Sequence, residues 1–152
     1  MNIDQIMELL DWNRNPDDQA LGIKLGMETK CINVFLQPCN DSCGKNVWDN
    51  CAIILTEKTD RELEPYLFDL LRWIQDMNWP GAFRIFKRLG TFSDKRLLNR
   101  TLRNGIKIAR ALDDSVWETT LRKLQKLVNK SSGENESFAG ESPEPPFCSI
   151  FA

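Results

Sequence analysis

The sequence predicts an all-α protein in which antiparallel helical hairpins stack on one another over residues 1–130, followed by a disordered tail over residues 131–152. Apolar side chains recur at three- and four-residue spacing through most of the first 130 residues, as on the buried face of a helix. Proline, aspartate, asparagine and glycine separate these segments at positions typical of helix starts and ends. From Ser131 onward serine, glycine, glutamate and proline dominate, and such a composition favours disorder.

Two helices are predicted before the first long loop. The first covers residues 3–12, where apolar residues follow helical spacing. Asn15 is the expected cap of the second, because Pro16 suits a first helical position and the helix dipole favours Asp17 and Asp18 in the first turn. We expect the second helix to bury Leu21, Ile23, Leu25 and Met27, with Gly22 allowing a close neighbour.

The loop at residues 37–45 follows a short apolar turn at residues 31–36 and combines proline, asparagine, aspartate, serine and glycine. Beyond it Asp60 is an expected helix cap, Pro65 is expected within the first turn or so of that helix, and Thr91 or Ser93 is expected to cap a later helix. The expected helices after the loop are residues 46–57, 60–76, 78–90, 94–112 and 115–128.

The predicted core combines large apolar side chains from every expected hairpin. Its members are Leu10, Trp12, Ile23, Trp48, Ile54, Leu70, Trp73, Ile85, Leu89, Ile108, Trp117 and Leu121.

The amino-acid composition limits the kinds of catalytic and metal-binding site that the chain can form. The chain contains no histidine, which excludes histidine-based catalytic triads and histidine metal ligands. Its five cysteines are an odd number, and the first residues lack the basic and apolar regions of a signal peptide. No apolar run approaches the roughly 18 residues that a spanning helix needs. We therefore expect a cytoplasmic protein with reduced thiols, no cofactor and no membrane partner.

Charge is segregated along the chain. Residues 1–81 carry 7 basic and 14 acidic side chains, a net charge of −7, and residues 82–130 carry 13 basic and 4 acidic ones, a net charge of +9. The last segment, residues 131–152, adds four glutamates, and the whole chain has a net charge of −2. Such asymmetry can steer a charged partner, though it says little about the fold.

Two segments resemble one another. Residues 8–12 (Glu-Leu-Leu-Asp-Trp) match residues 69–73 (Asp-Leu-Leu-Arg-Trp) at an offset of 61, and a proline-started helix with Ala and Ile follows each. Repeated hairpins that cannot bury a face alone stack into a solenoid, so a true repeat predicts a short HEAT-like stack. A chance likeness between two amphipathic hairpins is the alternative.

Residues 70–82, Leu-Leu-Arg-Trp-Ile-Gln-Asp-Met-Asn-Trp-Pro-Gly-Ala, resemble the signature of a bacterial family of unknown function built around Trp-x-Gln-Asp-Met-Asn-Trp-Pro. With Asn46-Val47-Trp48 and Asn50-Cys51-Ala52, the likeness covers roughly residues 3–128. The resemblance implies a small HEAT-like helical protein, and some members of the family are associated with immunity to polymorphic toxins. The family has no assigned chemistry, so no catalytic residue is implied.

The best candidate site is the polar stretch at residues 75–79 together with its counterpart in the first hairpin. We predict a partner-binding cluster of Asp11, Asp18, Asp76, Asn78 and Trp79, because carboxylates, an amide and an indole can clasp a partner's loop. If the repeat is real, both turns lie along one edge of the stack. The alternative is that Asp76 and Asn78 cap helix ends and that Trp79 packs beside the next helix.

Other residue sets have structural explanations. Cys31, Cys39, Cys43 and Cys51 stand at spacings of 8, 4 and 8, which zinc sites do not use, so reduced thiols are favoured over a metal site. The acidic residues at expected helix starts (Asp17, Asp18, Asp49 and Asp60) are explained by capping rather than by acid–base chemistry. No phosphate loop or nucleophile elbow occurs, and we expect no enzyme activity.

The region of residues 84–110 is basic, and several of its cations recur at three- and four-residue steps on one helix. This stripe is either a solvated helix face or a surface that tracks nucleic-acid phosphates. From the charge segregation and the family resemblance, we expect a non-enzymatic protein-binding module, with an immunity protein that neutralises a bacterial toxin as the leading hypothesis. The alternatives are a nucleic-acid-binding helical protein that uses residues 84–110 and a general scaffold or adaptor.

Overall fold

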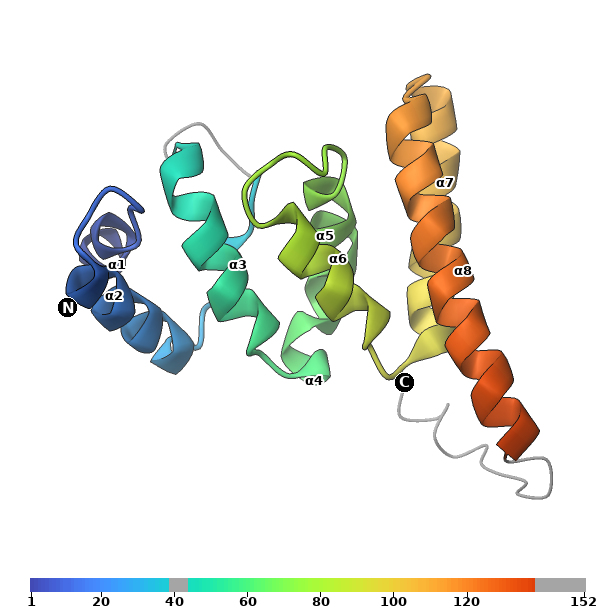
Figure 1. Ribbon diagram of the computed structural model, residues 1–152, viewed down its shortest axis with the longest axis horizontal. Coiled ribbons are helices and arrows are strands. Elements are labelled where there is room, and N and C mark those ends of the chain that lie inside the picture. Colours follow the sequence, from blue (N-terminus) through green and yellow to red (C-terminus); the bar gives the residue numbers. More distant parts are fainter. Residues whose placement is uncertain (39–43, 139–152) are drawn as a thin grey trace. The chain divides into compact units, whose positions relative to one another are not determined.

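The computed structural model describes residues 1–38 and 44–138, and of residues 132–138 it describes the backbone alone. These residues form helices and turns without a strand, which confirms the all-α prediction (Figure 1). The chain divides into two compact units, Met1–Arg88 and Leu89–Ala152, which we call unit 1 and unit 2.

Unit 1 is built from short helices. It contains α1 (Ile3–Leu9), α2 (Pro16–Glu28), η1 (Asn33–Phe35), η2 (Lys45–Val47), α3 (Trp48–Thr56), α4 (Asp60–Leu63), η3 (Glu64–Tyr66), α5 (Leu67–Trp73) and most of α6 (Ala82–Gly90), where η marks a 3₁₀ helix.

Two of the predicted helix starts in unit 1 can be compared with the structure. Asn15 caps α2 as expected, because its side-chain oxygen accepts from the Asp18 backbone N–H at 2.8 Å. The cap of α4 is Thr59 rather than Asp60: its hydroxyl accepts from Glu62 N–H at 3.2 Å, while the Glu62 carboxylate accepts from Thr59 N–H at 3.0 Å. The signal of a threonine followed three residues later by glutamate was present in the sequence.

The expected helix over residues 60–76 is divided. α4, η3 and α5 follow one another, and Pro65 lies in the 3₁₀ turn between the two α-helices. Proline has no N–H to donate and crowds the preceding turn, so the α-helical hydrogen-bond ladder cannot continue through it.

The buried face of α2 differs from the predicted one. Leu21 and Met27 are 43% and 38% exposed, whereas Gly22 and Gly26 are buried. A Cβ on Gly22 would stand 2.8 Å from Leu9 Cβ, and one on Gly26 would overlap the Ile54 side chain. α2 therefore packs against its neighbours through its glycines. The predicted residues recur every two positions, which is not helical spacing.

Most of the predicted core is buried, but three of its twelve members are not. Leu10, Trp48, Ile54, Leu70, Trp73, Ile85, Leu89, Trp117 and Leu121 are at most 6% exposed. Trp12 is 49% exposed because α1 ends at Leu9 and places it in the turn, and Ile108 is 39% exposed on α7. Ile23 is half-buried.

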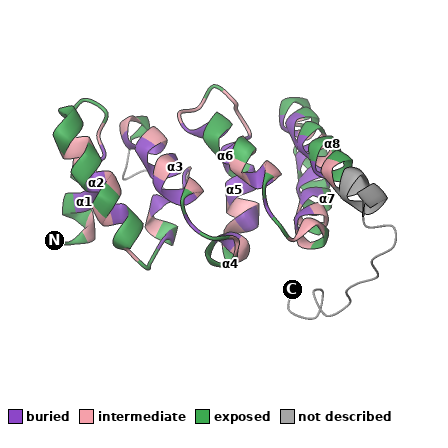
Figure 2. Cartoon of the chain, turned by 60° about the horizontal axis from the view of Figure 1, so that its bottom comes forward, coloured by how far each residue is buried: buried purple, intermediate pink, exposed green. Residues whose placement is uncertain are grey.

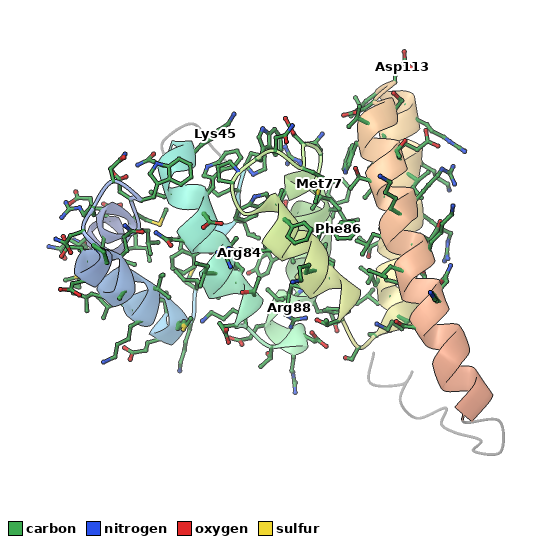
Figure 3. The ribbon with its side chains drawn as sticks, viewed as in Figure 1. Lys45, Met77, Arg84, Phe86, Arg88 and Asp113 are labelled. Atoms are coloured by element: carbon green, nitrogen blue, oxygen red, sulfur yellow. The ribbon has the colours of Figure 1, made fainter. Side chains whose placement is uncertain are left out.

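A buried lysine joins three elements of unit 1. Lys58 is 7% exposed, and its ammonium donates to the carbonyls of Met27 and Thr29 at 2.8 and 2.9 Å. These carbonyls lie at the C-terminal end of α2, where cations are favoured by the helix dipole. From α6, the Arg88 guanidinium donates to the Lys58 carbonyl at 2.9 Å and to the Asp60 carboxylate at 2.6 Å (Figure 3).

Unit 2 is a hairpin of two long helices, α7 (Lys95–Ala111) and α8 (Ser115–Phe138). Asp94, rather than Thr91 or Ser93, caps α7 by accepting from Leu97 N–H at 3.0 Å. Asp113, with φ of 59°, makes the turn between the helices, and the Asp114 carboxylate accepts from Trp117 N–H at 3.0 Å. The facing sides of α7 and α8 are buried (Figure 2).

α8 continues to Phe138, past its predicted end at residue 128 and past residue 131, where the disordered tail is predicted to begin. Residues 139–152 lie outside the described residues. No helix in the described part of the chain is long and apolar enough to cross a membrane.

Candidate functional site

Unit 1 contains two inter-helix connections that we call elbows: the first elbow joins α1 to α2, and the second joins α5 to α6. Both contain the same local turn. Between α1 and α2, the Asp11 carboxylate accepts from the Asn13 backbone N–H at 2.9 Å. Between α5 and α6, the Asp76 carboxylate accepts from the Asn78 backbone N–H, also at 2.9 Å. An aspartate that accepts from the residue two positions later forms an Asx turn, which fixes the direction of the chain.

The elbow between α5 and α6 is held by aromatic side chains. The buried Trp73 indole donates to the Pro80 carbonyl at 2.9 Å, so one side chain closes the turn. Trp48 of α3 contacts Trp73 and Trp79 edge to face, with ring centroids 6.1 and 5.4 Å away. Edge-to-face contacts are a favoured aromatic geometry. Gly81, with φ of +83°, completes the turn.

The elbow between α1 and α2 is held by amides instead. Asn50 of α3 is 6% exposed, and its side-chain N–H groups donate to the Leu10 carbonyl at 2.8 Å and to the Gln19 side-chain oxygen at 3.0 Å. Gln19 in turn donates to the carbonyls of Arg14 at 2.6 Å and Trp12 at 3.3 Å. With its carbonyls satisfied in this way, the elbow does not need the Trp12 ring inside it.

The 3₁₀ turn η2 lies between the two elbows. The Trp12 backbone N–H donates to the Asn46 carbonyl at 3.0 Å. On the other side, the Lys45 ammonium stands 5.9 Å from the ring centroid of Trp79 (Figure 3). Both elbows therefore lie along one edge of unit 1, which we call the elbow edge. It consists of Asp11, Trp12, Lys45, Asn46, Asp76, Asn78 and Trp79.

A cleft of about 390 Å³ opens at the first elbow. It is lined by Asp4, Met7, Glu8, Asp11, Arg14, Gly44, Asn46 and Val47. Three carboxylates face one guanidinium there, and Arg14 approaches Glu8 at 3.9 Å and Asp18 at 3.4 Å. Met7 and Val47 supply apolar surface. A cleft with apolar walls and excess negative charge suits a lysine or arginine side chain.

The Asp11 carboxylate of this cleft stays ionised to a lower pH than an ordinary aspartate. A hydrogen bond from the Asn13 backbone, followed by one from the Asn46 side chain, lowers the pKa of Asp11 below its ordinary value of 3.8. Hydrogen bonds to a carboxylate favour the ionised form. Asp11 is therefore an anion throughout the physiological pH range.

Four of the five predicted site residues lie on the elbow edge, and Asp18 does not. Asp11 lines the cleft, whereas Asp18 belongs to the cap of α2 and reaches the cleft only through Arg14. Asp76 and Asn78 form the second turn, and Trp79 packs on Trp48.

Sequence reasoning missed three residues of the first elbow. Asp4 and Glu8 line the cleft with Asp11: a spacing of four residues places Asp4 and Glu8 on one side of α1, and Asp11 follows in the turn. That spacing was a usable signal. Trp12 belongs to the predicted core, yet it is 49% exposed.

A second cavity, of about 410 Å³, is lined by Asn33, Val34, Leu36, Gln37, Pro38, Tyr66 and Asp69. Gln37 is 2% exposed, and its buried side-chain oxygen has no hydrogen-bond partner among the residues that the structure describes.

The cysteine set predicted to hold reduced thiols rather than zinc is described in part. Cys51 is buried in α3, Cys31 is exposed and donates to the Asn33 side-chain oxygen at 2.8 Å, and Cys39 and Cys43 lie outside the described residues. Within the described residues, no three potential metal ligands stand close enough to share an ion.

These features define an all-α protein whose packed helices present paired Asx-turn elbows along one edge of unit 1. Residues 44–137 match a family model described as a domain of unknown function, DUF5071, which covers more than half of the 152-residue chain. The chain belongs to this family. The match begins at η2 and includes the second elbow and α7, while α1 and α2 precede it. Comparison with curated proteins and with solved structures gives no match.

Proposed function

We propose that this chain is a non-enzymatic protein-binding module, and that it acts as an immunity protein that neutralises a bacterial toxin by binding it directly. In this proposal the elbow edge receives a basic surface of the toxin. The observation that carries it is the cleft at the first elbow, which is lined by three carboxylates, one guanidinium and apolar side chains. The HEAT-like character of the stack and a cytoplasmic location belong to the same proposal.

Charge complementarity supports this assignment. Residues 1–81 carry a net charge of −7, with 7 basic and 14 acidic side chains. Nucleic-acid-cleaving toxins need basic surfaces to hold their substrate, and opposite charge accelerates the encounter of two proteins. The half-exposed Trp12 stands beside the cleft, and tryptophan is among the residues that contribute most to protein interfaces.

A toxin domain encoded by a gene adjacent to this one would be the probe for the proposal. Co-expression of the two proteins should restore growth to bacteria that the toxin alone kills, and the purified pair should form a stable complex. Growth inhibition that persists despite well-folded, abundant chain would contradict the immunity proposal.

Replacing Asp11 and Asp76 by asparagine locates the contact. Asparagine keeps the oxygen that each Asx turn needs and removes the charge. We expect association with the toxin domain to slow several-fold at low salt, and the difference to shrink as salt screens the remaining charges. The control replaces Glu28 and Glu57 by glutamine, since these exposed carboxylates lie at the far ends of α2 and α3. Equal slowing by both double variants would show that net charge, rather than the elbow edge, governs binding.

A further inference from the structure

The basic helix of unit 2 has a surface that the proposed function does not use. α7 contains Lys95, Arg96, Arg100, Arg103, Lys107 and Arg110 within 17 residues, and it contains no aspartate or glutamate. Two of these cations have partners inside unit 2: Lys95 donates to the Gly90 carbonyl at 3.3 Å, and Arg110 pairs with Glu118 at 3.0 Å.

The other four cations form a continuous exposed stripe. Arg96, Arg100, Arg103 and Lys107 are all exposed, and none of them forms an ion pair with a carboxylate in the described part of the chain. They recur at steps of four, three and four residues, so they share one side of α7 and span about 16 Å along its axis.

The stripe lies opposite the packing face of the same helix. Leu98, Leu102 and Ala109 are fully buried in unit 2, and the helical period places the four cations about half a turn away from them. The rigid α7–α8 hairpin therefore holds these cations in a row on its outer surface.

We infer that this stripe, Arg96, Arg100, Arg103 and Lys107, binds the phosphate backbone of double-stranded nucleic acid without reading its sequence. Three of the four cations are arginines, whose guanidinium groups match phosphate oxygens in a bidentate way. A row about 16 Å long covers several successive phosphates, because one strand of a duplex carries a phosphate about every 3.4 Å of axis.

The composition of α7 favours a duplex over other polyanionic partners. The helix has no phenylalanine, tyrosine or tryptophan on which the bases of a single strand would stack. Its main apolar face is buried against α8, so no continuous apolar face remains for insertion into a bilayer. The inference is independent of the proposed toxin binding, since it uses unit 2 alone.

Salt dependence of binding to a labelled DNA duplex tests the inference quantitatively. Four phosphate contacts predict a slope of log affinity against log salt of about −3.6, which is about a 150-fold loss of affinity between roughly 50 and 200 mM salt. Replacing Arg96, Arg100 and Arg103 by alanine in the full chain leaves one contact. The slope should fall to about −0.9, with roughly a three-fold loss over the same range.

A matched control separates the stripe from net charge. Lys123, Lys126 and Lys130 are exposed cations on α8, away from its buried face, so their replacement by alanine removes the same charge from the opposite side of the hairpin. We expect this variant to keep the original affinity within about two-fold and to keep the slope. Equal losses in both triple variants, no duplex binding at low salt, or binding to vesicles of acidic phospholipid without binding to the duplex would each overturn the inference.

Discussion

Gly81 offers the most demanding test of how the second elbow is built. Its φ of +83° is a conformation that side-chain-bearing residues rarely adopt. A Cβ at this position would stand 2.7 Å from Ala52 Cβ, 3.1 Å from the Trp48 carbonyl oxygen and 3.1 Å from the Trp73 ring. These neighbours are buried side chains and backbone that have little room to move. Gly81→Ala should therefore disturb both the turn and the packing around Trp73.

The expected loss of stability in Gly81→Ala is the sum of two unfavourable contributions, reduced by one favourable contribution. A left-handed conformation costs an alanine about 1–2 kcal/mol, and overpacking a filled site typically costs about 1–3 kcal/mol. Alanine also restricts the unfolded chain, which offsets about 0.4–1 kcal/mol. The free energy of unfolding should fall by roughly 2–4 kcal/mol. Urea unfolding followed by tryptophan emission measures it, since four of the five tryptophans lie in unit 1.

A control and a double variant make the test specific. Gly90→Ala places a Cβ 3.2 Å from the flexible end of Leu127 at a helical position, so it should be neutral or stabilise by up to about 1 kcal/mol. Combining Gly81→Ala with Ala52→Gly removes the closest contact and should recover about 1 kcal/mol or more relative to additivity. A Gly81→Ala protein within about 0.5 kcal/mol of the original, well inside the usual range for surface substitutions, would refute the reasoning.

The remaining predictions concern buried polar groups and one exposed carboxylate. Asn50→Ala should lower the free energy of unfolding by about 2–3 kcal/mol in urea unfolding, because it leaves the Leu10 carbonyl buried without its donor. Lys58→Met should cost about 1–3 kcal/mol by the same assay, since two carbonyls at the end of α2 lose a charged donor. Gln37→Met should instead stabilise by about 1 kcal/mol, because the buried Gln37 oxygen has no hydrogen-bond partner in the described part of the chain; a loss of stability would contradict this. Hydrogen bonds from Arg122 and then Arg110 lower the pKa of Glu118 below 4.5. The ionised Glu118 therefore contributes its full share to the free energy of unfolding above pH 4.5, and this share disappears as the pH falls through the lowered pKa. Urea midpoints of Glu118→Gln and the original chain should accordingly differ at pH 7 and converge in acid.

The sequence carries enough local information to predict the helical class and several helix starts. Asn15 with Pro16 forms the predicted cap because both residues act on their own backbone. Nine of the twelve predicted core residues are buried, since large apolar side chains within helices at helical spacing face the neighbouring helices. Interactions between residues within one turn of the chain can therefore be predicted from the sequence.

Features that depend on distant neighbours were not predictable in the same way. α2 buries its glycines because α1 and α3 approach so closely that only glycine fits, and nothing within α2 reveals that approach. Lys58 appears in the sequence as an ordinary surface lysine, yet its ammonium is buried against carbonyls about thirty residues away. The acidic cleft combines residues of α1 with η2 across the elbow, so only the Asp4, Glu8 and Asp11 spacing was available beforehand.

The two elbows have similar sequences but hold their tryptophans differently. In the second, Trp73 is fully buried and its indole closes the turn on Pro80, so this tryptophan is a structural part. In the first, Asn50 and Gln19 satisfy the turn carbonyls, and Trp12 is left 49% exposed. The same exposure makes Trp12 the side chain on the elbow edge that a protein partner would bury with the greatest gain.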